Sequence, residues 1–250
     1  MEKDQIINKV MEKKELRNIP LEDVEMALGM CLGEEIGERE AVKKTRALLH
    51  KVYGAFGSRK LLQLRERDPE WILRKHLSTR ERMPYYKELY GKILKKGETI
   101  IDLGAGVNGF SLSYVPENKY FGVEGIGELV DLMNDYFAKN KMKAKALHLS
   151  LFNLRMIKNE IGEINGKKVV FLFKVLDSLE MLERDFSKKL LEEITPLVDR
   201  VVVSFATRSM ISRKLFKAKR RWVIDFIKER FKILEDFELG GERYVVFKGK

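Results

Sequence analysis

The spacing of apolar residues changes along the chain and divides it into two parts. From the first residue to about residue 74, apolar positions recur at intervals of three and four, as expected for helices with one buried face. Beyond Gly97, short runs of β-branched and aromatic residues alternate with helical stretches, a pattern typical of a parallel sheet covered by helices. The predicted strands are residues 99–103, 120–124, 144–149, 169–174 and 200–205.

The end of the chain departs from this parallel pattern. Helices are predicted over residues 128–138 and 179–194, and Pro196 ends the second. Two strand-like segments, 231–238 and 243–247, then lie on either side of a glycine pair, which predicts a β-hairpin. We therefore expect a mostly parallel sheet with an antiparallel hairpin at its C-terminal end.

The segment that joins the two parts predicts the start of a helix. Ser78 and Glu81 have the spacing of a capping box, so a helix is expected from Ser78 to about residue 95, kinked or restarted at Pro84. Arg80 and Arg82 are not needed for capping. At a helix start they would meet an unfavourable dipole, which indicates another role for them.

The glycines after the first predicted strand indicate a ligand. Gly104 and Gly106 allow a tight turn against a bound molecule, because glycine has no Cβ. Asp102 precedes them, and Glu124 ends the next predicted strand, where ribose hydroxyls arrive in a Rossmann-type sheet. With Gly109, the glycines also match the G-x-G-x-x-G of dinucleotide-binding proteins, provided that Gly109 opens a helix.

This pattern favours one cofactor. Strand-Asp-x-Gly-x-Gly resembles motif I of S-adenosylmethionine-dependent methyltransferases, and the C-terminal hairpin resembles class I methyltransferases more than dehydrogenases. We therefore predict an α/β fold with a class I methyltransferase Rossmann-like sheet, preceded by an all-helical domain, and S-adenosylmethionine as cofactor. A glycine turn that binds no ligand is the alternative.

The charge distribution indicates a phosphate-rich partner. The chain carries 49 basic and 38 acidic residues, a net charge of +11. Residues 1–40 hold 6 basic and 11 acidic residues, whereas residues 41–76 hold 10 and 3, and residues 207–232 hold 10 and 2. Clustered Lys and Arg are typical of proteins that bind a nucleic-acid backbone. The alternative is that either basic segment, 41–76 or 207–232, forms solvent-exposed helix faces that bind no nucleic acid.

Composition argues against several other classes. A single cysteine, Cys31, excludes an intrachain disulfide and a cysteine-rich zinc site. His50, His76 and His148 share no metal-ligand spacing, so no metal is predicted. No apolar run reaches the roughly 20 residues of a membrane span, and the first residues lack the apolar core of a signal peptide. We expect a soluble, monomeric, cytoplasmic protein with no membrane partner.

Several segments together resemble one family, the Arm/Rmt (FmrO) enzymes of aminoglycoside resistance. These enzymes methylate N7 of a guanine in the decoding site of small-subunit ribosomal RNA. The resemblance implies methylation of 16S rRNA, free or in an assembling 30S subunit, by a sheet domain of residues 77–250, with residues 1–76 as a helical domain that docks on RNA. The segments are Leu49–Phe56, His76–Arg82, Ile101–Asn108, Phe173–Leu176 and Ser204–Ser209.

The resemblance also implies roles for particular residues. Arg80 would hold the methionine carboxylate of the cofactor, since its planar fork suits bidentate binding. Asp102 would orient the methionine amine or the glycine turn, and Glu124 would bind the ribose. The side where the target base enters would be lined by Lys174, Ser204, Thr207 and Arg208. Further cofactor contacts are expected from Gly104, Ala105, Gly106, Asn108, Ser150 and Phe173.

The chain departs from the family pattern at two places. Ser150 stands where the family carries an acid that contacts adenine, and residues 210–216 replace a glycine-rich run. The target nucleotide is therefore left open, as is the choice between a resistance enzyme and a housekeeping one. The residues expected to contact RNA are Lys43, Lys44, Arg46, Lys51, Arg59, Lys60, Arg213, Lys214, Lys217, Lys219, Arg220 and Arg221.

The chemistry favours a ring nitrogen as the methyl acceptor. Guanine N7 has a free lone pair and needs no general base, and the fourth predicted strand is followed by no Asn/Asp-Pro-Pro-aromatic motif. An exocyclic amine such as cytosine N4, which needs a proton acceptor, ranks second. Phe110, Phe205 and Trp222 are candidates to stack on an extruded base. A methyltransferase for small molecules or proteins, and a non-catalytic RNA-binding factor, remain as alternatives.

Overall fold

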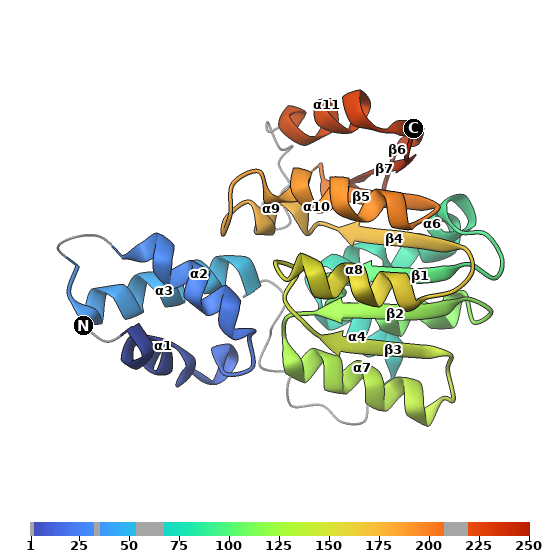
Figure 1. Ribbon diagram of the computed structural model, residues 1–250. Coiled ribbons are helices and arrows are strands. Elements are labelled where there is room, and N and C mark those ends of the chain that lie inside the picture. The colour runs from blue at the N-terminus through green and yellow to red at the C-terminus, as the bar shows by residue number, and fades with distance from the viewer. Residues whose placement is uncertain (1–2, 33–35, 54–67, 208–219) are drawn as a thin grey trace.

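A seven-stranded sheet forms the centre of the protein (Figure 1). The computed structural model describes residues 3–32, 36–53, 68–207 and 220–250. The strand order is β3-β2-β1-β4-β5-β7-β6, in which β1 to β5 run parallel and the β6–β7 hairpin is antiparallel. The predicted fold class is therefore confirmed. The strands are β1 (Thr99–Leu103), β2 (Lys119–Glu124), β3 (Ala144–His148), β4 (Lys168–Phe173), β5 (Arg200–Ala206), β6 (Lys232–Leu239) and β7 (Glu242–Lys248).

Helices cover both faces of the sheet, which explains why its central strands β1 and β4 are buried along almost their whole length. Successive residues of β1 point to opposite faces, so Ile100 packs into one core and Ile101 into the other. The helices of this part are α4 (Pro69–Lys75), α5 (Leu77–Arg82), α6 (Tyr86–Ile93), α7 (Gly127–Lys139), α8 (Leu154–Glu163), α9 (Leu176–Leu179), α10 (Phe186–Ile194) and α11 (Arg221–Arg230).

One predicted helix proves to be two. The sequence predicted a continuous helix over residues 179–194, but α9 ends at Leu179 and α10 begins at Phe186. Asp185, between them, has a left-handed backbone conformation with φ 63°. The Glu180 carboxylate accepts hydrogen bonds from the backbone N–H groups of Asp185 and Ser187, at 2.7 and 2.9 Å. These bonds satisfy N–H groups at the start of α10, which no preceding turn could serve.

Three N-terminal helices form a separate group with its own core. They are α1 (Lys3–Met11), α2 (Leu21–Cys31) and α3 (Glu38–Tyr53). This group lies at the edge where the parallel strands end (Figure 1). It touches the sheet domain through backbone as well as side chains, since the N–H of Gly127 donates to the carbonyl of Asn18 at 3.0 Å. The division of the chain at residue 76 stays a prediction, and Ile72 and Leu73 of α4 pack into the core of the sheet domain.

The capping box predicted at Ser78 is wrong. The N-cap of α5 is His76, which makes no side-chain capping bond, and Ser78 and Glu81 contact other residues described below. Arg80 and Arg82 lie in the last turn of α5, where the helix dipole favours cations, so the predicted conflict with the dipole is also wrong. The restart at Pro84 is confirmed, because a short 3₁₀ helix over Met83–Tyr85 separates α5 from α6.

Candidate active site

The glycine turn at the end of β1 is held tightly against its neighbours. The N–H groups of Gly104 and Ala105 donate to the carbonyl of Val123 in β2, at 2.8 and 3.0 Å. Gly104 and Gly106 have φ of +76° and +55°, and a Cβ at Gly104 would lie 2.4 Å from a methyl carbon of Val175. Both the backbone conformation and the space therefore require glycine at Gly104.

Replacing Gly104 by alanine is expected to lower the free energy of unfolding by about 1–3 kcal/mol, because alanine is strained at this φ and would collide with Val175. The same change should weaken binding of S-adenosylhomocysteine. Gly162→Ala in α8 is the control, since a Cβ there meets nothing within 4 Å. In a helix it should stabilise the protein slightly. Urea unfolding and calorimetry measure both effects, and equal stability of the two variants would contradict the prediction.

Asp102, which precedes the glycine turn, is fixed by two hydrogen bonds. Its carboxylate accepts hydrogen bonds from the Asn108 amide at 2.7 Å and from the Tyr120 hydroxyl at 2.9 Å. Burial raises the pKa of Asp102 to about 6, against the lowering effect of these two bonds. Asp102 was expected to orient either the methionine amine of the cofactor or the glycine turn, and these contacts support the second role. Gly109 lies in a 3₁₀ helix over Asn108–Tyr114 and not at the start of an α-helix, so the dinucleotide-binding pattern is not met.

Glu124 joins the glycine turn to the start of α7. One carboxylate oxygen accepts from the N–H of Gly106 at 2.7 Å and the other from the N–H of Ile126 at 2.9 Å. Burial raises its pKa. An ionised carboxylate has about four acceptor positions, so acceptors remain for two ribose hydroxyls. Glu124 and Gly104 line one cavity, as a nucleoside site requires.

The same cavity contains two residues from the helical group that the sequence did not single out. Asp23 of α2 and Tyr53 of α3 line it together with Gly104, Glu124 and a wall of Leu149, Leu151, Phe152 and Val175. Tyr53 also lies against Gly125, where a Cβ would be 2.9 Å from its ring. Tyr53 lies in Leu49–Phe56, one of the segments that carry the family resemblance, but no spacing connects it with the glycine turn, and Asp23 lies in none of those segments.

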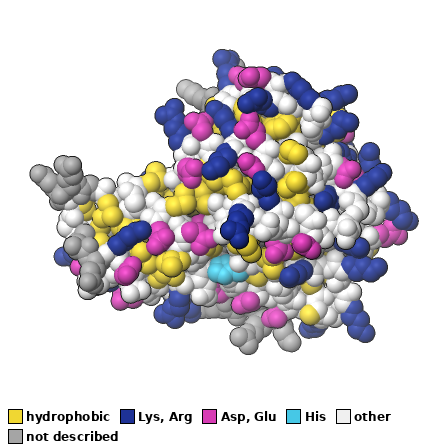
Figure 2. All heavy atoms as spheres, viewed as in Figure 1, with side chains coloured by type: hydrophobic (Ala, Val, Ile, Leu, Met, Phe, Trp, Pro, Cys, Tyr) yellow, Lys and Arg dark blue, Asp and Glu magenta, His cyan; other side chains and the backbone are white. Residues whose placement is uncertain are grey.

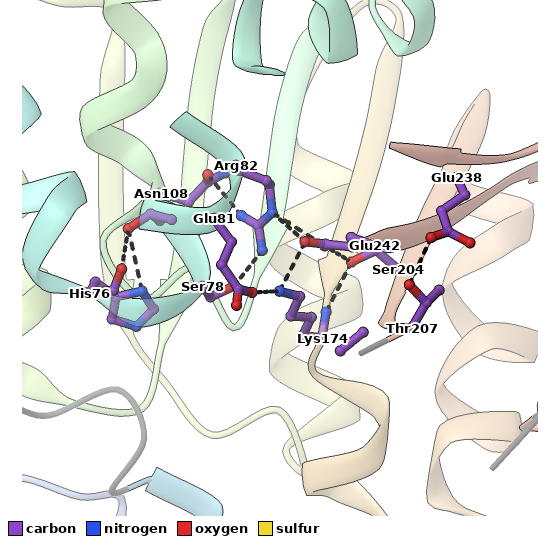
Figure 3. Close-up of polar contacts among 12 residues, drawn as sticks. His76, Ser78, Glu81, Arg82, Asn108, Lys174, Ser204, Thr207, Glu238 and Glu242 are labelled. Carbon is purple, nitrogen blue, oxygen red and sulfur yellow. Dashed lines mark hydrogen bonds and ion pairs between the residues drawn. The ribbon is translucent and has the colours of Figure 1, made fainter. Parts of the chain in front are cut away.

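A buried network of charged side chains lies beside the turn (Figure 3). The Arg82 guanidinium of α5 donates to both oxygens of Glu242 in β7 at 3.1–3.2 Å, and Lys174, after β4, lies 3.1 Å from the same carboxylate. Lys174 also pairs with Glu81 at 2.8 Å, and the Ser204 hydroxyl donates to Glu242. Burial alone would raise the pKa of Glu242, but Arg82 and Lys174 bring it below its usual value.

Asn108 connects this network to the glycine turn. Its side-chain oxygen accepts from Arg82 at 3.3 Å, while its amide donates to Asp102. Two of the four predicted base-side residues are held together, since the backbone N–H of Lys174 donates to the carbonyl and the hydroxyl of Ser204, both at 3.2 Å. A continuous path of hydrogen bonds therefore links the two halves of the predicted site.

Other predicted site residues lie elsewhere or make different contacts. Thr207 donates to Glu238 at 2.9 Å, and Phe173 is buried under the Arg82 guanidinium. Arg80 is exposed at the end of α5, and Ala105 is buried in the turn. Ser150 is buried and donates to Asp23. Phe110 and Phe205 are buried in the two cores, so the prediction that either stacks on a base is wrong; Trp222 is half-buried.

The predicted RNA-binding residues differ in their freedom to meet a partner. Lys43, Lys51 and Arg221 are exposed, and Lys44 pairs with Glu40 at 3.1 Å. Arg46 donates to the carbonyls of Lys9 and Val10, while Arg220 pairs with Asp177 at 2.8 Å. Lys and Arg side chains of the described residues are interspersed with Asp and Glu on the face in Figure 2. Arg59, Lys60, Arg208, Arg213, Lys214, Lys217 and Lys219 lie outside the described residues.

Two further features are absent from the described ranges. None of the helices there combines the length and the apolar character that crossing a membrane requires. Nor do three or more His, Cys, Asp or Glu side chains of those ranges gather as a metal ion would need. The site therefore rests on the glycine turn, Glu124 and the buried network.

Comparison with known proteins places this site in a family. The model of the family described as ribosomal RNA methyltransferase (FmrO) matches residues 22–230, which include α3 of the helical group and the five parallel strands of the sheet. The chain belongs to the FmrO family. It is accordingly a ribosomal RNA methyltransferase that uses S-adenosylmethionine, and the glycine turn and Glu124 fit that cofactor.

Two curated relatives extend over most of the chain. A 16S rRNA (guanine(1405)-N(7))-methyltransferase of Micromonospora rosea is 25% identical over 236 residues, covering 84% of this chain and 83% of the relative. An enzyme of the same name from Frankia casuarinae is 28% identical over 201 residues, covering 70% of this chain and 68% of the relative.

Solved structures share the fold of the whole chain. The 16S rRNA methyltransferase RmtF, in complex with S-adenosyl-L-homocysteine, superposes with a TM-score of 0.84 at 21% identity and is covered over its full length. The 16S rRNA methylase RmtB gives a TM-score of 0.83 at 19% identity, with 99% of that chain covered. The N-terminal helices are therefore part of the shared fold.

Proposed function

We propose that this FmrO-family enzyme transfers the methyl group of S-adenosylmethionine to N7 of a guanine in 16S rRNA, in the 30S subunit or during its assembly. The observation that carries the proposal is the match to the Micromonospora rosea guanine-N7 methyltransferase, which extends over 84% of this chain. We take the protein to act as a monomer in the cytoplasm, without a metal ion.

The cofactor is bound by residues at the ends of β1 and β2. Glu124 accepts hydrogen bonds from the ribose hydroxyls while the N–H groups of Gly106 and Ile126 keep its carboxylate in place. Asp102 holds the turn through Asn108, and Arg80 of α5 supplies a cation for the methionine carboxylate. Bound there, S-adenosylmethionine supplies an electrophilic methyl group.

The buried network favours a ring nitrogen over an exocyclic amine. Glu81 and Glu242 are the carboxylates that pair with Lys174, at 2.8 and 3.1 Å. Glu242 is the buried one, and it is already engaged by Arg82, Lys174 and the Ser204 hydroxyl. A carboxylate held by three donors, with its pKa lowered, is a poor proton acceptor. Guanine N7 needs none, so the enzyme has only to align donor and acceptor at attack distance.

Lys174 is the residue we assign to the target guanine. Its ammonium group has three donors, and Glu81 and Glu242 account for two of them. Guanine presents O6 and N7 as acceptors on one edge. A third bond from Lys174 to O6 would orient the base and leave the N7 lone pair free for the methyl group.

The RNA is expected to meet α3 and the start of α11. Lys43, Lys51 and Arg221 are exposed there, and basic residues of this kind bind phosphates without reading sequence. The net charge of +11 would assist this association at low salt.

Transfer of a radiolabelled methyl group tests the proposal. Purified protein, S-adenosylmethionine labelled in the methyl group, and 30S subunits, naked 16S rRNA or 50S subunits are incubated in parallel. We expect label in small-subunit RNA and none above background in 50S subunits. Label in protein alone, or in neither the 30S subunits nor the naked 16S rRNA, would overturn the assignment to small-subunit rRNA.

A further inference from the structure

Asp23 is a buried carboxylate in the cofactor cavity that no role above uses. It lies in the first turn of α2, is 1% exposed, and lines the cavity that contains Gly104 and Glu124. Burying a carboxylate is costly unless it is hydrogen-bonded. A group retained at such a cost inside a ligand cavity calls for an explanation.

Two hydroxyl groups hold the Asp23 carboxylate in one orientation. Ser150 donates to one oxygen and Tyr53 to the other. Ser150 is itself held, because its hydroxyl accepts from the N–H of Phe152 at 3.0 Å. Each carboxylate oxygen has more than one acceptor position, so the two hydroxyls leave acceptors for a ligand.

The sheet places Asp23 on the side of the cavity where the base of a nucleoside would lie. Glu124 ends β2 and is paired in register with His148, the last residue of the neighbouring β3. Ser150 follows His148 by two residues, and its hydrogen bond to Asp23 places that carboxylate beside the end of β3. A nucleoside whose ribose is held at Glu124 therefore directs its base either toward Asp23 or back toward the glycine turn, where the methionine part of the cofactor must lie.

The surrounding wall is apolar, which makes the carboxylate selective. Leu149, Leu151 and Phe152 line the cavity beside Asp23. Such a wall suits the faces of a flat base, and an acceptor within it suits an N–H group at the edge of that base. An ionised carboxylate can only accept hydrogen bonds, so it would bind an amino group and disfavour a carbonyl oxygen.

We propose that Asp23, positioned by Ser150 and Tyr53, accepts a hydrogen bond from the exocyclic amino group of the cofactor's adenine. The inference rests on the proposed function, since it assumes S-adenosylmethionine as the ligand. It gives the helical group a part in cofactor binding: Asp23 comes from α2 and Tyr53 from α3, whereas Glu124 comes from the sheet. Ser150 becomes a positioning residue that no longer needs to touch adenine itself.

Binding of two ligands that differ at one group tests this directly. S-adenosylhomocysteine and S-inosylhomocysteine are titrated by calorimetry into the full chain; the second carries a carbonyl oxygen in place of the amino group. We expect the unaltered protein to bind the adenosyl compound at least ten-fold more tightly. In Asp23→Asn the preference should fall to within about two-fold, because an amide can donate to the carbonyl as well as accept from the amine.

Control variants separate recognition from stability. Asp131→Asn removes an exposed carboxylate of α7 and should leave the preference unchanged. Ser150→Ala keeps the Asp23 carboxylate but removes one hydroxyl that orients it, so the preference should fall part of the way. Thermal unfolding confirms that each variant is folded.

The possible outcomes are distinct. Equal binding of the two compounds by the unaltered protein would overturn the proposal without any variant. An undiminished preference in folded Asp23→Asn would overturn it too. If the unaltered protein binds neither compound, the proposed methyltransferase function fails with it, whereas intact methyl transfer to 30S subunits with no adenine preference would refute the role of Asp23 alone.

Discussion

Replacing Glu242 by alanine is expected to lower the free energy of unfolding by about 3–5 kcal/mol, the largest change in stability that we predict. Glu242 is 2% exposed and is the counter-charge of Arg82, which is 4% exposed, and of Lys174. Without it, two cations would remain in the protein interior without their shared carboxylate, and an uncompensated buried charge is strongly destabilising. Urea unfolding followed by circular dichroism measures the change.

Asp236→Ala is the matched control for this variant. Asp236 lies in the same hairpin and pairs with Arg243 at 2.6 Å, but both side chains are about one-third exposed. Such pairs contribute roughly 0–1 kcal/mol. If the two variants unfold at the same urea concentration, the buried network does not hold β7 to α5.

The stability that Glu242 provides should also depend on pH in a defined direction. Its pKa is lower in the folded protein than in the unfolded chain, because Arg82 and Lys174 outweigh the effect of burial. Its contribution is therefore present above the unfolded pKa and is lost as the pH falls through the folded one. Asp23 and Asp102, whose pKa values burial raises to about 6, act in the opposite sense.

Replacing Glu124 by alanine is expected to weaken binding of S-adenosylhomocysteine at least 100-fold, the largest effect on a ligand that we predict. A hydrogen bond to a charged group contributes about 1.5–3 kcal/mol, and Glu124 is expected to accept two from the ribose. A loss of about 3–6 kcal/mol corresponds to a factor of more than 100 in affinity. Calorimetry on the purified protein gives the two affinities.

Two further variants test whether the loss of binding in Glu124→Ala has an indirect cause. Glu124→Gln keeps the size of the side chain and an acceptor for the N–H of Gly106, so it separates loss of charge from collapse of the turn. Glu117→Ala removes an exposed carboxylate, paired with Lys96 on the surface, and should bind as the unaltered protein does. Binding by folded Glu124→Ala within two-fold of that value would mean that Glu124 does not hold the ribose.

The strands could be predicted because their signal is local. The five parallel strands were placed within one residue at each end, and for β1, β4 and β5 the reason is that runs of β-branched residues buried on both faces leave little ambiguity. The glycine turn and Glu124 were found for the same reason: their spacing reflects one strand, one turn and the next strand. The helix boundaries near Asp185 depended instead on a side chain, Glu180, whose contacts spacing does not reveal.

The contacts that complete the site could not be predicted, because they join residues distant in sequence. Asp23 meets Ser150 across 127 positions, and Arg82 meets Glu242 across 160. The burial of Arg82 could not be predicted from local sequence either. Arg82 lies one turn after Ser78, on the face of α5 that packs against the sheet, and its hydrogen bond to Ser78 replaces the predicted cap.

These long-range contacts couple the parts of the enzyme. Asn108 connects Asp102 under the glycine turn with Arg82, and Arg82 connects onward to Glu242 and Lys174. Displacement of any member would therefore shift both the cofactor and the residue that we assign to the target base. This explains why so many polar side chains are retained in the interior beside the turn.

The nucleoside that receives the methyl group tests the account most directly. After incubation of 30S subunits with the protein and S-adenosylmethionine, the 16S rRNA is digested to nucleosides and analysed by mass spectrometry against a reaction with Glu124→Ala. We predict one new product, 7-methylguanosine, that is absent with the variant. Methylation of cytosine N4 in its place, or no new methylated nucleoside in the RNA, would contradict the account.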